Sequence, residues 1–266
     1  MQLKLFVLYH GGEPLLNKNF VEMVKQIKQL GVTKIKTVSN GMLLNDDIIE
    51  GIVSNGLDQI EFSIDGLHPA ENNNIRCGSD YSVIINNIKR LIQYKKKVNS
   101  IFPEIFIANT QFITTDIHTI HKTPLPPEYL INNFSGIYAD DIAGFKCNWA
   151  MKWPGMFVSE KMYTVYHDSN DTGVCNECDQ VKNVTTIRWD GSIVACCYDL
   201  INQYVIGNIL NENLEIIWNN DNFLRLRQSI DHKKFIPLCV HCNVVQPNTY
   251  LSLKKNVFSS KKGLRN

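Results

Sequence analysis

Hydrophobic positions in the first 115 residues follow two alternating periods. Apolar or alternating runs predict strands at residues 3–9, 34–39, 59–65 and 105–114. Between them, apolar residues three and four positions apart predict amphipathic helices at residues 17–30, 45–53 and 81–94, because such residues share one face of a helix. This order of strands and helices predicts a parallel sheet with right-handed crossovers, and so an α/β fold.

The predicted strand at residues 59–65 is apolar on one face and polar on the other. Its apolar residues are Ile60, Phe62 and Ile64, and its polar residues are Glu61, Ser63 and Asp65. A parallel strand covered by helices on both faces would be apolar throughout, so the polar face predicts a lined cavity, as inside an open barrel. Asn109 and Gln111 extend the same prediction to the next strand.

The second half of the chain has a different character. Prolines interrupt residues 116–174, where residues 136–145 predict a last barrel strand. After residue 175, two short apolar runs flank Asp190-Gly191, which is a hairpin signal, and residues 214–230 predict an amphipathic helix. We therefore predict a partial barrel at residues 1–146, a linker at 147–174, a small cysteine-rich domain at 175–245 and a basic tail at 246–266.

Composition narrows the class of protein. The chain has 266 residues and a net charge of +1, so it predicts no general surface for nucleic acid. No apolar run approaches the roughly 20 residues that span a bilayer, and the apolar start at residues 1–10 is too short for a signal peptide. These features predict a cytoplasmic protein without a membrane partner. Eight cysteines in a reducing compartment favour metal ligation.

Cysteine spacing in the last third gives the strongest chemical signal. Cys178 and Cys196 bracket the Asp190-Gly191 turn, and Cys239 and Cys242 form a close pair further on. Such spacing predicts a metal ion or an iron–sulfur cluster rather than disulfides. One alternative is zinc held by Cys175 with Cys178, Cys239 and Cys242, which leaves Cys196 without a role. Cys77 and Cys147 are interpreted as small buried hydrophobic residues.

A glycine-rich turn follows the first predicted strand. It consists of Gly11, Gly12, Glu13 and Pro14. Parallel strands end there, at the edge where α/β proteins bind ligands, and glycine lets the backbone come close to a ligand. Glu13 is suited to accept charge-assisted hydrogen bonds from an ammonium group. The alternative is a tight turn with an exposed glutamate.

Six stretches, taken together, resemble one enzyme superfamily. They are residues 11–14, 39–41, 62–66, 190–199, 207–218 and 239–242. In their order and spacing, the chain resembles a radical S-adenosylmethionine (SAM) enzyme with a C-terminal SPASM or twitch auxiliary-cluster domain. The resemblance runs from about residue 3 to residue 243 and is thinnest between residues 116 and 174. It implies an open, partial (β/α) barrel that lacks its first βα unit, followed by a hairpin-and-helix cluster domain.

The resemblance also implies a SAM site at the end of the barrel. Gly11–Pro14 corresponds to the turn that holds the amino group of SAM, with Glu13 as acceptor. Ser63, Asp65 and Arg76 are implied to hold its carboxylate or ribose, and Arg is suited to bidentate carboxylate binding. Asn40 belongs to the same predicted site. The alternatives are that Arg76 is a surface residue and that Asn40 only forms the turn after its strand.

For the cysteines, the resemblance implies one auxiliary 4Fe–4S cluster. Cys178, Cys196, Cys239 and Cys242 match the twitch pattern, with Cys175 as a possible replacement for Cys178. The full SPASM pattern needs further cysteines after Cys242, and the sequence has none. Cys197 is interpreted as structural. Asp199 is a candidate base near the substrate or, equally, the cap of a turn.

One defining motif of the superfamily is not in these 266 residues. The Cys-x-x-x-Cys-x-x-Cys loop binds the cluster that cleaves SAM, and the sequence has no cysteine before Cys77. We expect a truncated, split or decayed relative, and no cleavage of SAM by this chain alone. The intact relative is implied to be an oxidoreductase or maturase that uses a 5′-deoxyadenosyl radical on a peptide, protein or sugar. It would take electrons from a flavodoxin or ferredoxin. The alternative function is a non-catalytic metal-binding module.

Overall fold

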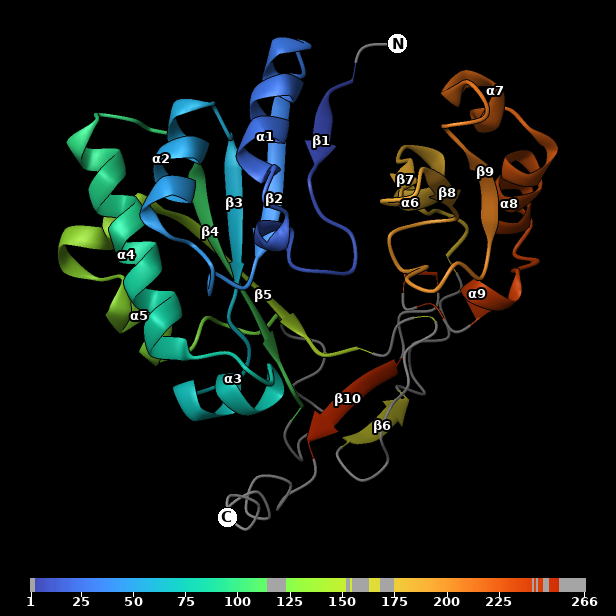
Figure 1. The fold of residues 1–266 in the computed structure, drawn as a ribbon. Helices are drawn as coiled ribbons and strands as arrows, with labels where there is room; N and C mark the ends of the chain where they lie inside the picture. The colour runs from blue at the N-terminus through green and yellow to red at the C-terminus, as the bar shows by residue number, and fades with distance from the viewer. Residues whose placement is uncertain are drawn as a thin grey trace, which may run out of the picture. The chain divides into compact units, whose positions relative to one another are not determined.

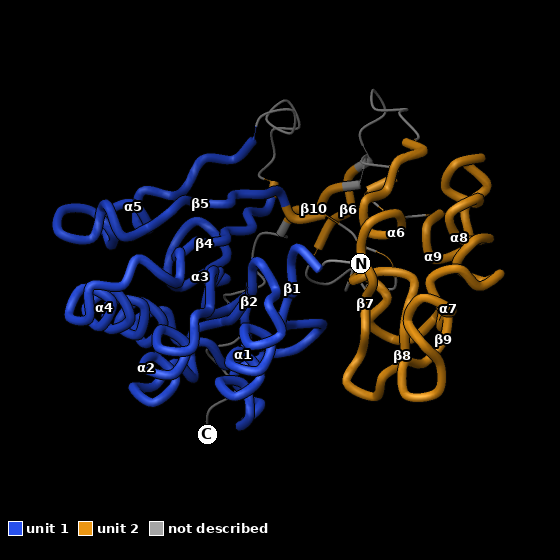
Figure 2. Tube along the Cα trace, turned by 90° about the horizontal axis from the view of Figure 1, so that it is seen from above, with its two compact units in different colours: residues 1–112, 118–149 blue, residues 113–117, 150–266 orange. Residues whose placement is uncertain are grey.

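A computed structural model describes residues 3–113, 123–151, 154, 163–167, 175–240, 242, 244–245 and 249–253. The chain forms two compact units, coloured separately in Figure 2. The first contains the described residues up to 112 and those from 123 to 149, and the second contains residue 113 and the described residues from 150 onward. In the described ranges, no helix is long and apolar enough to cross a membrane.

A five-stranded parallel sheet forms the first unit, with its strands in chain order (Figure 1). The strands are β1 (Leu5–Val7), β2 (Lys34–Ser39), β3 (Gln59–Ser63), β4 (Glu104–Gln111) and β5 (Ile142–Trp149). All four neighbouring pairs are parallel. The α/β architecture predicted from the alternating periods is therefore confirmed.

Helices pack on one face of this sheet. They are η1 (Pro14–Leu16), α1 (Phe20–Gln29), α2 (Asp46–Ser54), α4 (Tyr81–Lys97), α5 (Glu128–Asn133) and η3 (Gly136–Asp141), while α3 (Pro69–Ile75) contacts α4. Apolar stripes of α1, α2 and α4 pack in one core against the alternate strand residues Ile35, Ile60, Phe62 and Ile107. The residues between them on each strand form a second, half-buried face, because successive side chains of a strand point to opposite sides.

Side-chain caps set where the long helices begin. The Asn45 carboxamide accepts a hydrogen bond from the backbone N–H of Ile48, and Asp80 accepts from the backbone N–H groups of Ser82 and Val83. Each cap satisfies N–H groups that have no partner within the helix, which stabilises a helix by roughly 1 kcal/mol.

Two predictions about the strands are corrected. Asn109 and Gln111 have the same parity as Ile105 and Ile107, so they lie on the helix-covered face and not in a cavity. Both are buried, and the Asn109 amide donates to the backbone carbonyls of Ile64 and Gly66 at 2.7 and 2.9 Å. The last strand also begins later than predicted, because residues 136–141 form the 3-10 turn η3.

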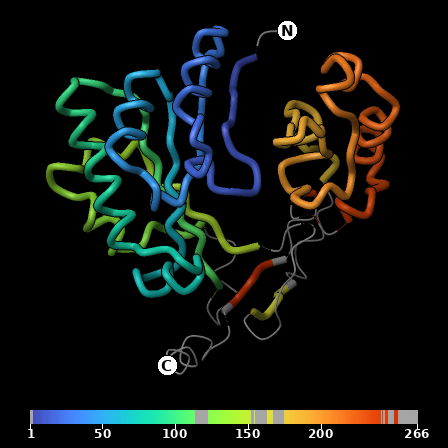
Figure 3. The backbone as a smooth tube through the Cα atoms, in the orientation of Figure 1, coloured from blue at the N-terminus to red at the C-terminus, as the bar shows by residue number. Residues whose placement is uncertain are grey.

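The second unit contains two small antiparallel sheets, whose strands are labelled in Figure 1 and whose chain path Figure 3 traces. One pairs β6 (Tyr163–His167) with β10 (Thr249–Leu253), and the other orders β7 (Thr186–Ile187), β8 (Ser192–Val194) and β9 (Val205–Asn208). The helices are α6 (Asp179–Lys182), α7 (Leu214–Trp218), α8 (Asp221–Asp231) and α9 (Pro237–Val240). Strands thus occur within the predicted linker and the predicted tail.

The predicted helix at residues 214–230 is two helices. Asn220 separates them, because its side chain accepts a hydrogen bond from the backbone N–H of Phe223 and so begins a new helix. The break lets the Trp218 ring pack on the Phe223 ring, with centroids 4.7 Å apart, beneath the Arg227 guanidinium. This packing forms part of the core around the cysteines.

Candidate functional site

Four predicted cysteines gather in the core of the second unit. Cys178 caps α6, Cys196 follows β8, Cys239 lies in α9, and Cys242 follows it in a tight turn. All four thiols are 6–7% exposed and belong to one apolar cluster with residues such as Ile193. A short helix, α6, follows Cys178 directly. None of the four is in a disulfide.

The thiols lie near enough to affect one another. Burial, together with the neighbouring Cys197, Cys242 and Cys178 thiols, raises the pKa of Cys196 to about 12. Burial likewise raises the pKa of Cys239 to about 12, with added contributions from Cys242, Cys196 and Cys178. A bare apolar pocket therefore keeps these sulfurs protonated, and a bound cation or cluster would supply the positive charge that a thiolate needs.

Backbone amides point at two of the sulfurs. The Tyr198 amide bonds to the Cys196 sulfur, and the Val244 and Val245 amides bond to the Cys242 sulfur. These contacts act against burial, because a hydrogen bond to the charged form stabilises a thiolate. Hydrogen bonds to sulfur also tune the potential of iron–sulfur clusters. Four buried thiols with amide donors thus fit the ligand set of a cluster.

Among the residues that the structure describes, no three His, Cys, Asp or Glu side chains meet the geometry of a single-ion site. A zinc ion would draw each sulfur to about 2.3 Å from one centre, whereas a four-iron cluster occupies more space. The Cys175 thiol is half-buried and contacts the backbone of Glu177. Cys175 therefore lies outside the cluster of buried residues that contains Cys178, Cys196, Cys239 and Cys242.

Asp199 and Cys197 lie beside these thiols. Asp199 is 1% exposed, and its two carboxylate oxygens accept hydrogen bonds from the backbone N–H groups of Gln203 and Tyr204 at 2.7 and 2.8 Å. This geometry favours the turn-capping alternative. Cys197 is half-buried; burial raises its pKa, and so do the nearby Cys178 and Cys242 thiols. Cys197, which was interpreted as structural, is therefore a fifth thiol near the site.

Glu13 lies at the carboxyl-terminal edge of the parallel sheet. Its Oε1 atom accepts hydrogen bonds from the Leu15 amide and the Ser39 hydroxyl at 3.1 and 2.8 Å, and its Oε2 atom accepts from the Asn40 amide at 2.7 Å. The carboxylate thus ties the turn after β1 to the end of β2. Because a carboxylate oxygen accepts two hydrogen bonds, Oε2 retains one acceptor position.

The backbone beside Glu13 suits a close approach by a ligand. Gly11 has a φ of +66°, which favours glycine. A methyl group added at Gly12 would meet no atom within 4 Å, so that side of the turn is open. Pro14 begins η1. Asn40 forms its own turn, since its side chain accepts a hydrogen bond from the Met42 amide at 2.9 Å.

Asp65 and Arg76 form an ion pair at the same edge, on the loop after β3. The Arg76 Nε atom donates to Asp65 Oδ2 at 2.8 Å, and the Thr110 amide donates to Oδ1 at 3.0 Å. The Asp65 side chain is 10% exposed and that of Arg76 is 32% exposed. The terminal nitrogens of Arg76 make no hydrogen bond with the described residues, so they are available to a carboxylate. Ser63 is half-buried on the same face.

Sequence reasoning missed the residues that hold this loop. Asn72 is fully buried; its side-chain oxygen accepts from the Asp65 amide, and its nitrogen donates to the Ser79 hydroxyl. The Asn109 side chain also donates a hydrogen bond to the Gly66 carbonyl. The one signal that would have indicated Asn72 is an Asn within a short helix, once that helix is known to be buried, since buried amides are hydrogen-bonded.

Comparison with known proteins identifies the family. Residues 2–106 match the radical SAM superfamily model, and residues 175–243 match the model of SPASM, an iron–sulfur cluster-binding domain. The chain therefore belongs to the radical SAM superfamily and carries a SPASM iron–sulfur domain after its parallel sheet. Both domains were predicted from the sequence motifs, and both are confirmed.

Three similar proteins illustrate the range of the family. The tungsten-containing aldehyde ferredoxin oxidoreductase cofactor-modifying protein of Pyrococcus furiosus is 24% identical over 91% of this chain and 74% of its own length. A probable GTP 3′,8-cyclase of Methanocaldococcus jannaschii is 35% identical over 31% of this chain and 27% of its own length. The structure of anSMEcpe with bound AdoMet and Cp18Cys peptide shares the fold, with a TM-score of 0.54, 14% identity, and coverage of 94% of this chain and 76% of that one.

Proposed function

We propose that this chain is part of a radical SAM oxidoreductase or maturase, in which its SPASM domain holds one auxiliary 4Fe–4S cluster. The observation that carries this proposal is the set of buried thiols that three separate segments bring into one apolar core. The ligands we propose are Cys178, Cys196, Cys239 and Cys242. Ligation of a metal cluster accounts for the burial of these four thiols together and for the backbone amides that bond to two of the sulfurs.

We propose that SAM binds at the carboxyl-terminal edge of the parallel sheet. Glu13 would accept a hydrogen bond from the ammonium group of SAM through its Oε2 atom. Arg76, which Asp65 holds in place, would donate its terminal nitrogens to the carboxylate, and Ser63 lies on the same face. In the intact relative, one electron from the Cys-x-x-x-Cys-x-x-Cys cluster, a motif that these 266 residues lack, would cleave SAM to methionine and a 5′-deoxyadenosyl radical, which would remove a hydrogen atom from the substrate. The residues of this chain bind and orient SAM and exclude water.

The family resemblance implies a peptide, protein or sugar as substrate, and the relatives support a peptide or a cofactor. A flavodoxin or ferredoxin is the proposed electron donor. The cofactor-modifying protein of Pyrococcus furiosus and the peptide-bound anSMEcpe structure each exemplify one of these substrate classes.

Metal analysis after anaerobic reconstitution tests the cluster. We expect about four irons and four sulfides per chain. Changing Cys239→Ala or Cys242→Ala should remove the iron, whereas the matched control Cys147→Ala, a buried cysteine of the first unit, should retain it. Full iron in both ligand variants would overturn the ligand assignment.

The same measurement distinguishes the cluster proposal from the alternative of a non-catalytic zinc module. That alternative predicts a colourless protein with one zinc and no sulfide. It also predicts that Cys175→Ala loses the metal and that Cys196→Ala retains it. The cluster proposal predicts the reverse for these two variants.

A further inference from the structure

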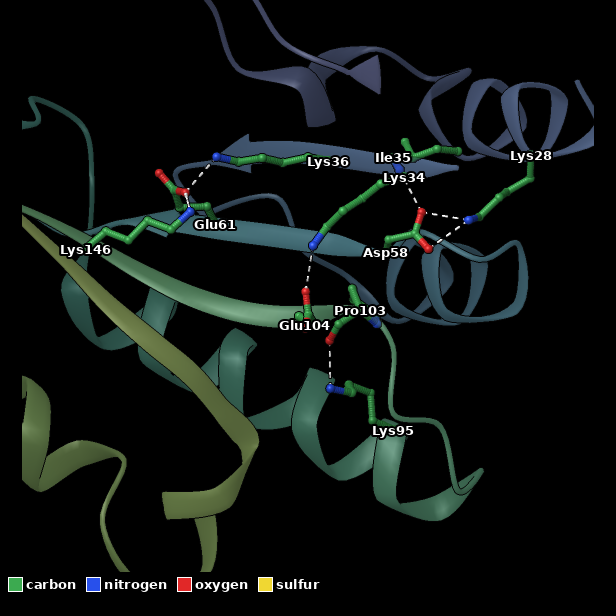
Figure 4. A network of polar contacts seen from close by, with 10 residues as sticks. All are labelled: Lys28, Lys34, Ile35, Lys36, Asp58, Glu61, Lys95, Pro103, Glu104 and Lys146. Atoms are coloured by element: carbon green, nitrogen blue, oxygen red, sulfur yellow. Dashed lines mark hydrogen bonds and ion pairs between the residues drawn. The ribbon is translucent and has the colours of Figure 1, made fainter. Parts of the chain in front are cut away.

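Two lysines share one glutamate on the sheet face that the helices leave uncovered. Lys36 of β2 and Lys146 of β5 both bond to the Oε2 atom of Glu61 on β3, with Nζ to Oε2 distances of 2.9 and 2.5 Å (Figure 4). Lys146 reaches across β4, with its ammonium 4.3 Å from the centre of the Phe106 ring. We call these three residues the Lys–Glu–Lys network.

The network is partly buried and carries excess positive charge. The Glu61 side chain is 13% exposed, whereas Lys36 and Lys146 are 21% and 36% exposed. Burial raises the pKa of Glu61, but the hydrogen bonds from Lys146 and Lys36 outweigh burial and lower it overall, so the carboxylate carries one negative charge. One carboxylate cannot neutralise two ammonium groups, and one positive charge is left on a half-buried face.

The nearby acidic residues are occupied elsewhere. Glu104 pairs with Lys34 at 2.9 Å, and Asp58 pairs with Lys28 at 2.7 Å (Figure 4). A structural ion pair would need only one lysine for Glu61, since unpaired charge in a low-dielectric place destabilises a fold. Lys146 nevertheless extends over an aromatic ring to the oxygen that Lys36 already contacts, so Glu61 holds two lysines where one would neutralise it.

We propose that Lys36 and Lys146 form a binding subsite for an anionic oxygen group of the substrate, a phosphate or a carboxylate. This inference rests on the proposed function, because it adds the substrate class to that same sheet face. Asp65 lies two residues beyond the end of β3 and four residues from Glu61, which is roughly 13 Å at about 3.3 Å per residue of extended chain. The substrate therefore has an anionic group on the order of 13 Å from the SAM-binding edge.

The Glu61 carboxylate takes the place of that anion as the partner of the two lysines. It holds both lysines in position while the subsite is empty and releases one when the anion arrives. This account gives opposite predictions for the two kinds of variant. Removing the lysines weakens anion binding, whereas removing the carboxylate strengthens it.

Calorimetry on the reconstituted full chain tests the subsite with inorganic phosphate, and with acetate in parallel to tell phosphate from carboxylate. Chloride at matched ionic strength controls for screening. We expect Lys36→Gln and Lys146→Gln each to weaken binding of the preferred anion about tenfold, as the loss of a charged hydrogen bond does. Glu61→Gln should tighten it severalfold. The control Lys34→Gln, whose lysine pairs with Glu104, should bind like the unchanged chain.

Each outcome has one meaning, provided that circular dichroism shows folded protein. Equal affinity in the unchanged chain and both lysine variants would overturn the inference, as would weaker binding in Glu61→Gln. Lys146→Met, which keeps the apolar stem over Phe106, replaces Lys146→Gln if the latter does not fold. Iron is measured in the same samples. Normal iron without anion binding overturns only the subsite, and anion binding without iron overturns only the proposed cluster.

Discussion

Replacing Glu13 tests whether one carboxylate fastens the turn after β1 to the end of β2. Glu13→Ala removes hydrogen bonds from the Leu15 amide, the Ser39 hydroxyl and the Asn40 amide. At a net ~0.5–1.5 kcal/mol each, the three contribute about 1.5–4.5 kcal/mol. Because Glu13 is half-buried, water can replace part of this, and we expect a loss of about 2 kcal/mol in local stability.

Hydrogen exchange of individual amides measures this loss where it occurs. At about 2 kcal/mol, the Asn40 and Leu15 amides should exchange roughly 30-fold faster in Glu13→Ala. Glu13→Gln should give a smaller increase, because its oxygen still accepts while its NH₂ group faces a donor. The control is Glu22→Ala on the exposed face of α1, where an ion pair of 3.7 Å with Lys25 should be worth less than about 0.5 kcal/mol.

The result that refutes this reasoning is unchanged exchange at both amides in Glu13→Ala. The turn would then be held by its backbone alone, and Glu13 would be free to serve only a ligand. A uniform increase over the whole first unit would also refute it, because that would indicate global rather than local destabilisation.

Three further predictions concern single residues. The pKa of Glu61 in the folded chain lies below its ordinary 4.5, so its stabilising effect is present above about pH 4.5 and is lost as the pH falls through the folded pKa. In denaturation measured against pH, the free energy of unfolding of Glu61→Gln should therefore fall less steeply toward acid pH than that of the unchanged chain. Gly41→Ala, at a φ of +75° with a new Cβ 3.1 Å from the Phe62 ring, should destabilise the first unit by about 2 kcal/mol in urea, and an unchanged midpoint would contradict this. Asp199→Asn turns an NH₂ group toward a backbone donor such as the Tyr204 amide, so we expect weaker iron retention after anaerobic reconstitution; iron equal to that of the unchanged chain would contradict this.

Local patterns predicted the first unit well because its contacts follow the chain. Strands and helices alternate, each strand pairs with the next, and the apolar stripe of each helix is visible in the sequence. The polar face of β3 was predicted correctly for Ser63 and Asp65, which lie opposite the buried Phe62. Parity would also have placed Asn109 correctly, since it continues the buried series of Ile105 and Ile107.

Contacts between distant segments were beyond the sequence. The pairing of β6 with β10 joins strands about eighty residues apart, and nothing local indicates it. The break between α7 and α8 depends on one capping Asn in an otherwise helical pattern. Cys197 lies near the Cys178 and Cys242 thiols because separate segments of the chain fold together there. The alternation of side chains along one strand does not indicate such a contact.

The strand pair β6–β10 has a consequence for how the SPASM segment is built into the chain. His167 pairs with Thr249, and the Cys175 amide bonds to the Val245 carbonyl at 2.9 Å, so the two ends of residues 175–245 lie next to each other. A segment whose ends meet can be excised or grafted as a cassette without stretching its host, because loop closure is already satisfied. Such a graft would keep the core that contains the thiols together. In the host protein, the segment could be inserted in the loop that joins two paired strands of a hairpin.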